Sequence, residues 1–174
     1  MSLAAEDTRS QMLALLPRLR RFALALTGHA ADADDLLQDT VERALANLSK
    51  WRPGTRMDSW LYRIAQNLWI DRVRARRVRR PLAGALDEAA APPFDGVRAA
   101  HAHLTLKRTL EALQALPPEQ RAVAALVLIE GVAYREAALI LELPIGTVTS
   151  RLARARETLA CRVLGDAEAR ATLP

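Results

Sequence analysis

YREAALILELPIGTVTSRLARAR, residues 134–156, is the stretch that decides the fold of this 174-residue chain. A short apolar helix over 134–141 meets a break at Leu143-Pro144, and a second helix begins near Gly146. In the second helix one side is apolar, as the spacing of Val148, Leu152, Ala155 and Leu159 indicates. Two helices joined by a tight turn predict a helix-turn-helix that can enter the major groove of DNA. The alternative is an ordinary amphipathic helix with a solvated basic face. The groups on the exposed side, suited to base edges and phosphates, are Thr147, Ser150, Arg151 and Arg154.

Composition limits the class of protein. Hydrophobic residues make up 51% of the chain but aromatic residues only 4%, which favours packed helices over sheets. The net charge of +5 lies mostly in the first 80 residues and favours an acidic partner such as nucleic acid. Cys161 is the only cysteine, so an intrachain disulfide or a thiolate zinc cluster is excluded. The sequence shows neither a signal peptide nor a membrane span, so we expect a soluble, cytoplasmic protein without membrane insertion.

The chain divides into two parts at a segment rich in Pro, Gly and small residues. We predict an all-α protein of two small helical domains, over residues 8–80 and 104–162. A flexible linker is expected over 81–103, and a C-terminal tail over 163–174; a loop within one domain is the alternative to the linker. The helices are expected at about 8–27, 32–50, 57–78, 104–116, 118–130, 134–141 and 145–161.

Two surfaces of the first domain carry polar patterns. In the helix expected over 32–50, the apolar side is Leu37, Val41, Ala44, Leu45 and Leu48, and the opposite side is Asp35, Gln38, Asp39 and Glu42. The helix over 57–78 is apolar on two sides, with Trp69 and Trp60 assigned to the core. It keeps one polar strip, Arg63, Asn67 and Arg74, before the arginine run at 72–80. Arginines bind phosphates, Asn can read a base edge, and Trp51 in the preceding loop can stack on an unpaired base, so this region is predicted to contact nucleic acid.

Catalytic signals are missing from the sequence. The three histidines lack ligand spacing to carboxylates, and no nucleotide-binding loop or nucleophile elbow occurs. We therefore expect no enzyme activity, no cofactor and no metal site.

Four motifs occur in order, at spacings that are highly specific in combination: DADDLLQDTVERAL at 32–45, SWLYRIAQNLWIDRVR at 59–74, ALPPEQRAV at 115–123 and GVAYREAALILELPIGTVTSRLARAR at 131–156. With these motifs, residues 11–162 resemble a bacterial RNA polymerase sigma factor of the extracytoplasmic-function (ECF) group. The resemblance implies sigma region 2 over the first domain and sigma region 4, with its helix-turn-helix, over the second.

The resemblance also implies a role in transcription initiation. Such a protein binds core RNA polymerase, directs it to promoters and helps to melt them, and an anti-sigma factor is a further implied partner. Region 4 would rest on the β flap, and the β′ clamp helices would bind Asp35, Gln38, Asp39 and Glu42. Contacts to the −10 element would come from Trp51, Arg52, Thr55, Arg56, Arg63, Asn67 and Arg74. Contacts to the −35 element would come from Thr147, Thr149, Ser150, Arg151 and Arg154.

Some positions depart from the family pattern, and two rival functions stay open. Thr149 stands where a basic residue is common, Ala133 where a capping serine is frequent, and Met57 where an aromatic is common. One rival is a sigma-like mimic that sequesters an anti-sigma factor and never binds DNA. Such a mimic would be expected to lose Arg63 and Arg151, which are present. The other rival is a repressor or activator that binds duplex DNA alone, which would leave the acidic helix unexplained.

Overall fold

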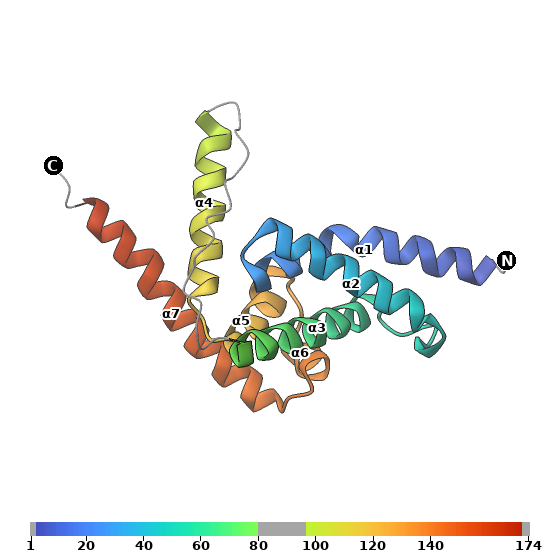
Figure 1. Cartoon of the computed structure of the whole chain (residues 1–174). Coiled ribbons are helices and arrows are strands. Elements are labelled where there is room, and N and C mark those ends of the chain that lie inside the picture. Colours follow the sequence, from blue (N-terminus) through green and yellow to red (C-terminus); the bar gives the residue numbers. More distant parts are fainter. Residues whose placement is uncertain (1–2, 80–96, 172–174) are drawn as a thin grey trace.

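The computed structural model describes residues 3–79 and 97–171, and all regular structure within these ranges is helical (Figure 1). This confirms the predicted all-α class. The described elements are α1 (Leu3–Thr27), α2 (Ala30–Ala46), the 3₁₀ helix η1 (Leu48–Lys50), α3 (Met57–Arg79), α4 (Val97–Gln114), α5 (Pro118–Ala124), the π-helix η2 (Ala125–Ile129), α6 (Tyr134–Leu141) and α7 (Ile145–Ala171).

The N-terminal bundle consists of α1, α2 and α3, which pack around two aromatic rings. Phe22 of α1 and Tyr62 of α3 meet edge to face, with ring centroids 5.0 Å apart and an angle of 63° between the planes. This geometry is favoured by the ring quadrupoles. Leu19 and Leu26 of α1 and Leu61 of α3 are buried beside them, as the apolar spacing predicts. The centre of the N-terminal bundle is therefore one compact aromatic and aliphatic core.

The buried face of α2 differs from the predicted one. Leu45, which was predicted to lie inside, is 46% exposed. The predicted face was the one that carries the larger apolar side chains of α2. In the structure α2 packs against both α1 and α3, and small side chains on its buried face allow the helices to approach closely. The hydroxyl of Thr40 donates a hydrogen bond of 2.6 Å to the carbonyl of Leu36, so burial leaves this donor satisfied. The buried residues of α2 are Ala33, Leu36, Thr40 and Ala44.

The C-terminal bundle contains the predicted helix-turn-helix. Helix α6 has the expected bounds, and α7 begins at Ile145 as expected. The helix predicted over 118–130 begins at Pro118, but its last turn is wider. There the amide of Glu130 donates to the carbonyl of Ala125, five residues back, at 3.1 Å. Gly131 then ends the helix with a φ of +68°, a conformation that glycine adopts without strain. Glu130 consequently lies at the end of the helix.

Two predicted boundaries are corrected by the structure. Residues 97–103, expected as the end of the linker, are helical and begin α4, and α7 continues through the expected tail to Ala171. Both segments are rich in alanine, which has the highest helix propensity but adds little to an apolar stripe. The period of the hydrophobic residues therefore does not reveal that these two segments are helical. The remainder of the predicted linker, residues 81–96, lies outside the described residues.

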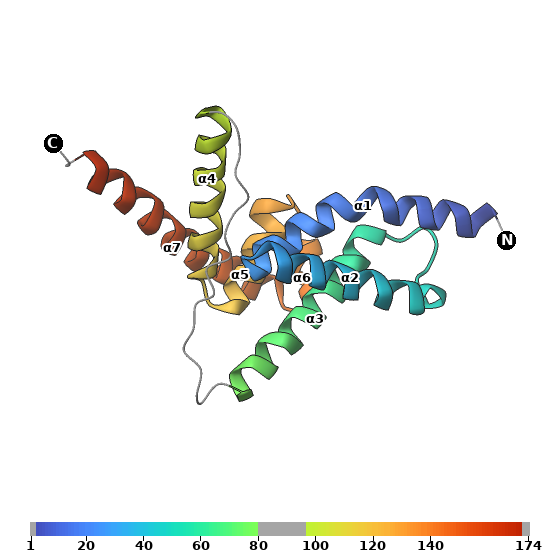
Figure 2. The same ribbon diagram turned by 45° about the horizontal axis from the view of Figure 1, so that its top comes forward.

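The two bundles pack against each other. Helix α1 contacts α4, α5 and η2, and α3 contacts α5 and α6 (Figures 1 and 2). The buried side chains of both bundles form one hydrophobic cluster, which runs from Met12 in α1 to Ala155 in α7. Helix α1 begins at one end of the molecule and α7 ends at the other (Figure 1). In this arrangement one side of α3 is covered by the C-terminal bundle.

Candidate nucleic-acid interface

The outward face of α7 is open. Val148, Leu152 and Ala155 are buried because this side of α7 packs against α4, α5 and α6. Of the residues predicted to read the upstream DNA element, three are exposed and two half-buried. The exposed ones are Thr149, Ser150 and Arg154, and the half-buried ones are Thr147 and Arg151.

The hydroxyls on this face form hydrogen bonds within the helix, whereas the guanidinium groups do not form ion pairs with described residues. The Thr149 hydroxyl donates to the carbonyl of Ile145 at 3.0 Å, and the Ser150 hydroxyl donates to the carbonyl of Thr147 at 3.1 Å. These hydroxyls are tied to the helix but keep acceptor capacity. The guanidinium groups of Arg151 and Arg154 form no ion pair within the described ranges, so they are the strongest donors available to a ligand.

The predicted polymerase-docking face of α2 is exposed at all four positions, Asp35, Gln38, Asp39 and Glu42. The Gln38 amide donates to the Glu42 carboxylate at 2.9 Å. Asp39 accepts a hydrogen bond from Arg72 of α3. Among the described residues, the carboxylates of Asp35 and Glu42 form no ion pair, so this surface keeps negative charge.

Two arginines of the run at 72–80, which is predicted to contact nucleic acid, pair with carboxylates of α2. Arg72 pairs with Asp39 and also donates to the backbone carbonyl of Asp35 at 3.3 Å, and Arg76 lies 3.1 Å from Asp32. The antiparallel packing of α2 and α3 brings these opposite charges together. Arg72 and Arg76 therefore attach α3 to α2. Arg74 is exposed, with a long ion pair of 3.8 Å to Asp71.

The loop before α3 is a tight turn that leaves its polar side chains exposed. Gly54 has a φ of +85°, and the hydroxyl of Thr55 donates to the carbonyl of Arg52 at 2.7 Å. Arg52 and Thr55 are exposed, whereas Trp51 is half-buried. The indole N–H of Trp51 is buried and has no hydrogen-bond partner within the described part of the chain.

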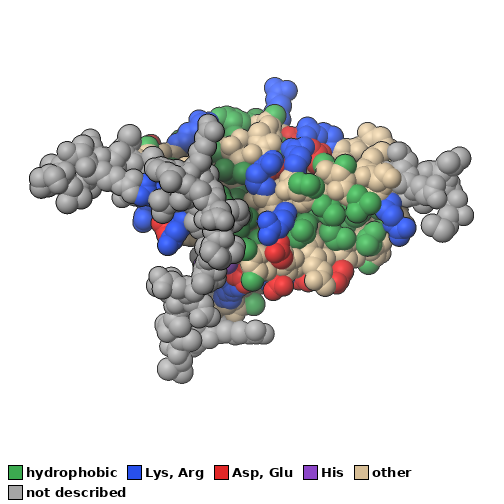
Figure 3. Space-filling model, turned by 90° about the horizontal axis from the view of Figure 1, so that it is seen from above, with side chains coloured by type: hydrophobic (Ala, Val, Ile, Leu, Met, Phe, Trp, Pro, Cys, Tyr) green, Lys and Arg blue, Asp and Glu red, His purple; other side chains and the backbone are tan. Residues whose placement is uncertain are grey.

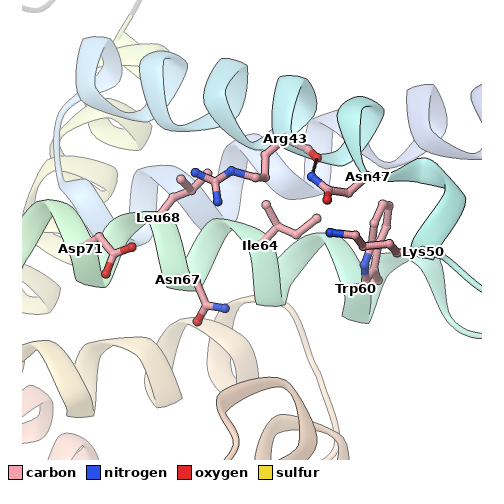
Figure 4. Close-up of a pocket in the computed structure, with 8 residues that line it drawn as sticks. All are labelled: Arg43, Asn47, Lys50, Trp60, Ile64, Asn67, Leu68 and Asp71. Carbon is pink, nitrogen blue, oxygen red and sulfur yellow. Dashed lines mark hydrogen bonds between the residues drawn. The ribbon is translucent and has the colours of Figure 1, made fainter.

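A pocket of about 240 Å³ lies between α2, η1 and α3 (Figure 4). Figure 4 shows the Arg43 guanidinium near Leu68, and the Lys50 ammonium extended towards Ile64. Apolar side chains line the pocket together with two cations, two amides and one carboxylate, and its cations and amides are suited to an unstacked base and its phosphates. Its lining residues are Arg43, Asn47, Lys50, Trp60, Ile64, Asn67, Leu68 and Asp71.

Only Asn67 of this lining was among the residues predicted for the −10 element. Trp60, predicted to be a core residue, is half-buried at the pocket instead. Arg43, Asn47 and Lys50 recur at intervals of four and three residues, the period of one helical face. That spacing is a signal in the sequence that could have identified them.

Two predicted −10 residues lie at the contact between the bundles. A guanidinium nitrogen of Arg56 is 2.7 Å from the carboxylate of Glu136 in α6. The Arg56 guanidinium also forms a bidentate pair with Asp58, and its hydrogen bonds lower the pKa of the Asp58 carboxyl. Arg63 lies 3.3 Å from the carboxylate of Glu142 and donates to the carbonyl of Leu139. Arg56 and Arg63 thus pair with residues of the C-terminal bundle, and neither is among the pocket-lining residues.

A buried carboxylate joins the two bundles. The side chain of Glu130 is fully buried, and both of its oxygens accept hydrogen bonds from Arg21, at 2.8 and 2.9 Å. The phenol of Tyr62 donates to the same carboxylate at 2.7 Å, and Arg18 lies at 3.4 Å. Burial raises the pKa of Tyr62, and the hydrogen bond to Glu130 adds to the effect. A buried carboxylate with several donors is well satisfied.

A second polar contact lies at the other end of this interface. Arg121 of α5 donates to the carbonyl of Leu26, at the end of α1, at 2.9 Å, and to the carbonyl of Gln114, at the end of α4, at 2.7 Å. Its guanidinium lies over the ring of Trp69 in α3, 5.7 Å from the centroid. Burial lowers the pKa of Arg121. A cation at two helix C-termini is favourable, because the carbonyls there carry partial negative charge.

On the face shown in Figure 3, Lys and Arg side chains lie among acidic ones and beside an apolar area. Within residues 3–79 and 97–171, no His, Cys, Asp and Glu side chains are grouped as a metal ion would require. None of the helices described is both long and apolar enough to cross a membrane.

Comparison with known proteins matches both bundles. A family model for Sigma-70 region 2 matches residues 12–79, and a model for Sigma-70, region 4 matches residues 106–159. The chain is 38% identical over 161 residues to the ECF RNA polymerase sigma factor EcfG of Rhodopseudomonas palustris (strain TIE-1), covering 92% of this chain and 87% of that protein.

Two solved structures have the same arrangement of helices. The sigma factor RpoE from Bartonella quintana, in complex with the anti-sigma factor NepR, superposes with a TM-score of 0.76 at 32% identity, covering 91% of this chain and 97% of RpoE. CnrH, in complex with the cytosolic domain of CnrY, gives a TM-score of 0.68 at 27% identity, covering 92% of this chain and 90% of CnrH. With both sigma regions matched in order and a relative aligned over nearly its whole length, the chain belongs to the family of ECF RNA polymerase sigma factors.

Proposed function

We propose that this sigma factor binds core RNA polymerase and directs it to promoters that carry −10 and −35 elements. The observation that carries the proposal is the open face of α7, where Arg151 and Arg154 lie without ion pairs in the described part of the chain. That face belongs to the second helix of a helix-turn-helix, the helix that enters the major groove. Arginines there can pair with guanine edges or with phosphates.

The pocket beside α3 supports a role for region 2 in melting the −10 element. Opening duplex DNA costs about 1.4 kcal/mol of stacking per base step, so a melting protein needs a place for unpaired bases. The pocket offers the ring of Trp60 and the amide of Asn67 for a base, and the cations of Arg43 and Lys50 for its phosphates. Arg52 and Thr55, exposed in the adjacent loop, would contact the same strand.

The partners follow from the remaining surfaces. The exposed, negatively charged face of α2 fits a basic protein surface, for which we propose the β′ clamp helices. Region 4 would rest on the β flap. RpoE from Bartonella quintana was solved with the anti-sigma factor NepR, and we propose that an anti-sigma factor also regulates this chain.

Run-off transcription with purified bacterial core polymerase, over a library of promoter fragments, tests this function. We expect transcripts that depend on the protein and arise from fragments sharing −10 and −35 motifs. An Arg151→Ala and Arg154→Ala double variant should lose them, because the upstream element is then read weakly. Absence of stimulation by pure, folded protein would overturn the proposal and favour a mimic that binds an anti-sigma factor.

A further inference from the structure

We propose that Thr149 contacts the methyl group of a thymine in the −35 element and thereby selects an A·T pair at one position of the promoter. The inference rests on the proposed function, because it places the outward face of α7 in the major groove. It names the chemical group on the DNA that Thr149 contacts, which the proposed function leaves open. The contact is apolar, although threonine carries a hydroxyl.

Thr149 lies in the first turns of α7, on the side that faces away from the protein. Helix α7 begins at Ile145, and the N-terminal residues of a recognition helix are the ones that contact base edges. Successive residues of a helix are about 100° apart around its axis, so Thr149 is turned well away from the fully buried Val148. Thr149 is accordingly exposed, as are Ser150 and Ala153. Thr149 therefore lies where a base edge would be read.

The hydroxyl of Thr149 is turned back onto its own helix. It donates a hydrogen bond of 3.0 Å to the carbonyl of Ile145, four residues earlier. The one donor of this hydroxyl is thus used within the helix, and only its acceptor capacity is left for a ligand. The methyl group is attached to the same carbon and occupies a different staggered position. With the hydroxyl held against the backbone, the methyl is the group of Thr149 that is left for an outside contact.

Ala153 extends this apolar surface by one helical turn. It follows Thr149 at an interval of four residues, so the two side chains are neighbours on the surface of α7. Each of them offers a methyl group, and neither carries a charge. Thymine presents a methyl group in the major groove, and the methyls of alanine and threonine are suited to contact it. Two adjacent methyl groups on the outward face of α7 therefore match the edge of an A·T pair.

The cations of the same face supply a different kind of contact. Arg151 and Arg154 form no ion pair with described residues, and their guanidinium groups can bind guanine edges or phosphates. A phosphate contact carries no sequence information, whereas a contact to a thymine methyl depends on the base. Thr149 thus adds selectivity for an A·T pair, which the two arginines do not provide.

Replacement of thymine by deoxyuridine tests the contact, because deoxyuridine lacks only the 5-methyl group. The holoenzyme is formed from the full-length protein and core polymerase, and it binds a fluorescent promoter fragment found by run-off transcription. Unlabelled fragments, in which each thymine of the −35 element on either strand is replaced in turn, then compete with the fluorescent one. The competition gives the affinity for each substituted fragment relative to the unsubstituted fragment.

Two variants separate the methyl group of Thr149 from its hydroxyl. Thr149→Ser removes the methyl and keeps the hydroxyl, whereas Thr149→Val keeps a methyl and removes the hydroxyl. Thr158→Ser is the matched control, because Thr158 lies farther along α7 and its hydroxyl also donates to a carbonyl four residues earlier, that of Arg154, at 3.1 Å.

With the unmodified protein, we expect deoxyuridine at one −35 position to lower the affinity about fourfold, as the loss of one buried methyl group predicts. Thr149→Ser should bind the unsubstituted fragment about fourfold more weakly and should no longer distinguish thymine from deoxyuridine at that position. Thr149→Val and Thr158→Ser should keep the discrimination of the unmodified protein.

Three results would overturn the assignment of Thr149. They are equal affinity for all deoxyuridine fragments, discrimination that persists in Thr149→Ser, and discrimination that is lost in Thr149→Val. Promoter-specific run-off transcription alongside any of these results would leave the proposed function intact. If the holoenzyme neither binds nor transcribes any fragment of the promoter library, the proposed function is wrong and the thymine contact falls with it.

Discussion

The phenol of Tyr62 donates a hydrogen bond of 2.7 Å to the carboxylate of Glu130, although 68 residues and a domain boundary separate them in sequence. Tyr62 lies in the core of region 2, and Glu130 ends the wide helical turn of region 4. The pair shows that the two regions are joined by a specific polar contact in addition to apolar packing. In this arrangement Thr149, Ser150 and Arg154 on the outward face of α7 stay exposed.

Replacing Glu130 should destabilise the protein. Glu130→Gln removes the negative charge that Arg21 and Arg18 neutralise. The amide also has only one acceptor oxygen, so it cannot accept all of the hydrogen bonds that Arg21 and Tyr62 donate to the carboxylate. We expect the free energy of unfolding to fall by about 2–4 kcal/mol, within the range for breaking buried ion pairs. Urea denaturation followed by circular dichroism measures the change, with exposed Glu157→Gln as the matched control. Equal stability of Glu130→Gln and the control would contradict a structural role for this carboxylate.

Alkaline pH should weaken the same contact. Burial raises the pKa of Tyr62 above its ordinary value of 10.0. Because the pKa is higher in the folded state, the contribution of Tyr62 to stability is complete below pH 10 and is lost as the pH rises from there towards the folded-state pKa. Tyr62→Phe has no group to ionise at this position, so its stability should fall less over that interval. Urea denaturation at a series of alkaline pH values compares the two, and parallel loss of stability would contradict the assignment.

Glu142 has a φ of +55°, and the strain of this left-handed conformation predicts an unusual ranking of two variants. Both Glu142→Gln and Glu142→Gly lose the ion pair with Arg63, but only glycine relieves the left-handed backbone. We expect Glu142→Gly to be the more stable by about 1 kcal/mol. Thermal unfolding of the two variants side by side tests this ranking. A less stable glycine variant would show that the turn is not strained by its side chain.

The recognition face of α7 should be sensitive to single truncations. Arg151→Ala or Arg154→Ala should each weaken binding to the −35 element by about 1–3 kcal/mol if the side chain contacts bases. Arg156→Ala removes the same charge from an exposed position about 200° around the helix from Arg154, and serves as the control. Binding to a promoter duplex and to a scrambled duplex separates base reading from phosphate contact. Unchanged promoter use in both variants would refute the mapping of this face.

Charge reversal on α2 should release the protein from polymerase. Asp35→Lys with Asp39→Lys places cations where a basic partner is proposed, and we expect about a hundredfold loss of affinity for core polymerase from like-charge contact. Asp39 also pairs with Arg72 of α3, so replacing it could disturb the packing of α2 on α3. The single variant Asp35→Lys leaves that ion pair intact and therefore tests polymerase docking by itself. Glu157→Lys controls for net charge. Retained polymerase affinity in the folded double variant would refute the docking surface.

The sequence by itself determined most of the helices and the outward face of α7. Helix α6 has the bounds that the pattern predicts, and Val148, Leu152 and Ala155 are buried as their spacing indicates. These features depend on contacts between residues three or four apart, so a helical period encodes them directly. The alanine-rich start of α4 and end of α7 were missed because alanine forms helix without marking a face.

Only the tertiary structure decided which polar side chains are free to bind. The sequence shows Arg63 and Arg72 as similar exposed arginines of one helix, yet Arg63 pairs with Glu142 of region 4 and Arg72 with Asp39 of α2. Glu130 reads as an ordinary helix-terminal glutamate, but it is buried against Tyr62 and Arg21. No local period records a contact between residues that are tens of positions apart. The packing of the two regions creates these contacts, because each buried or paired charge depends on a partner that only the folded chain brings within hydrogen-bonding distance.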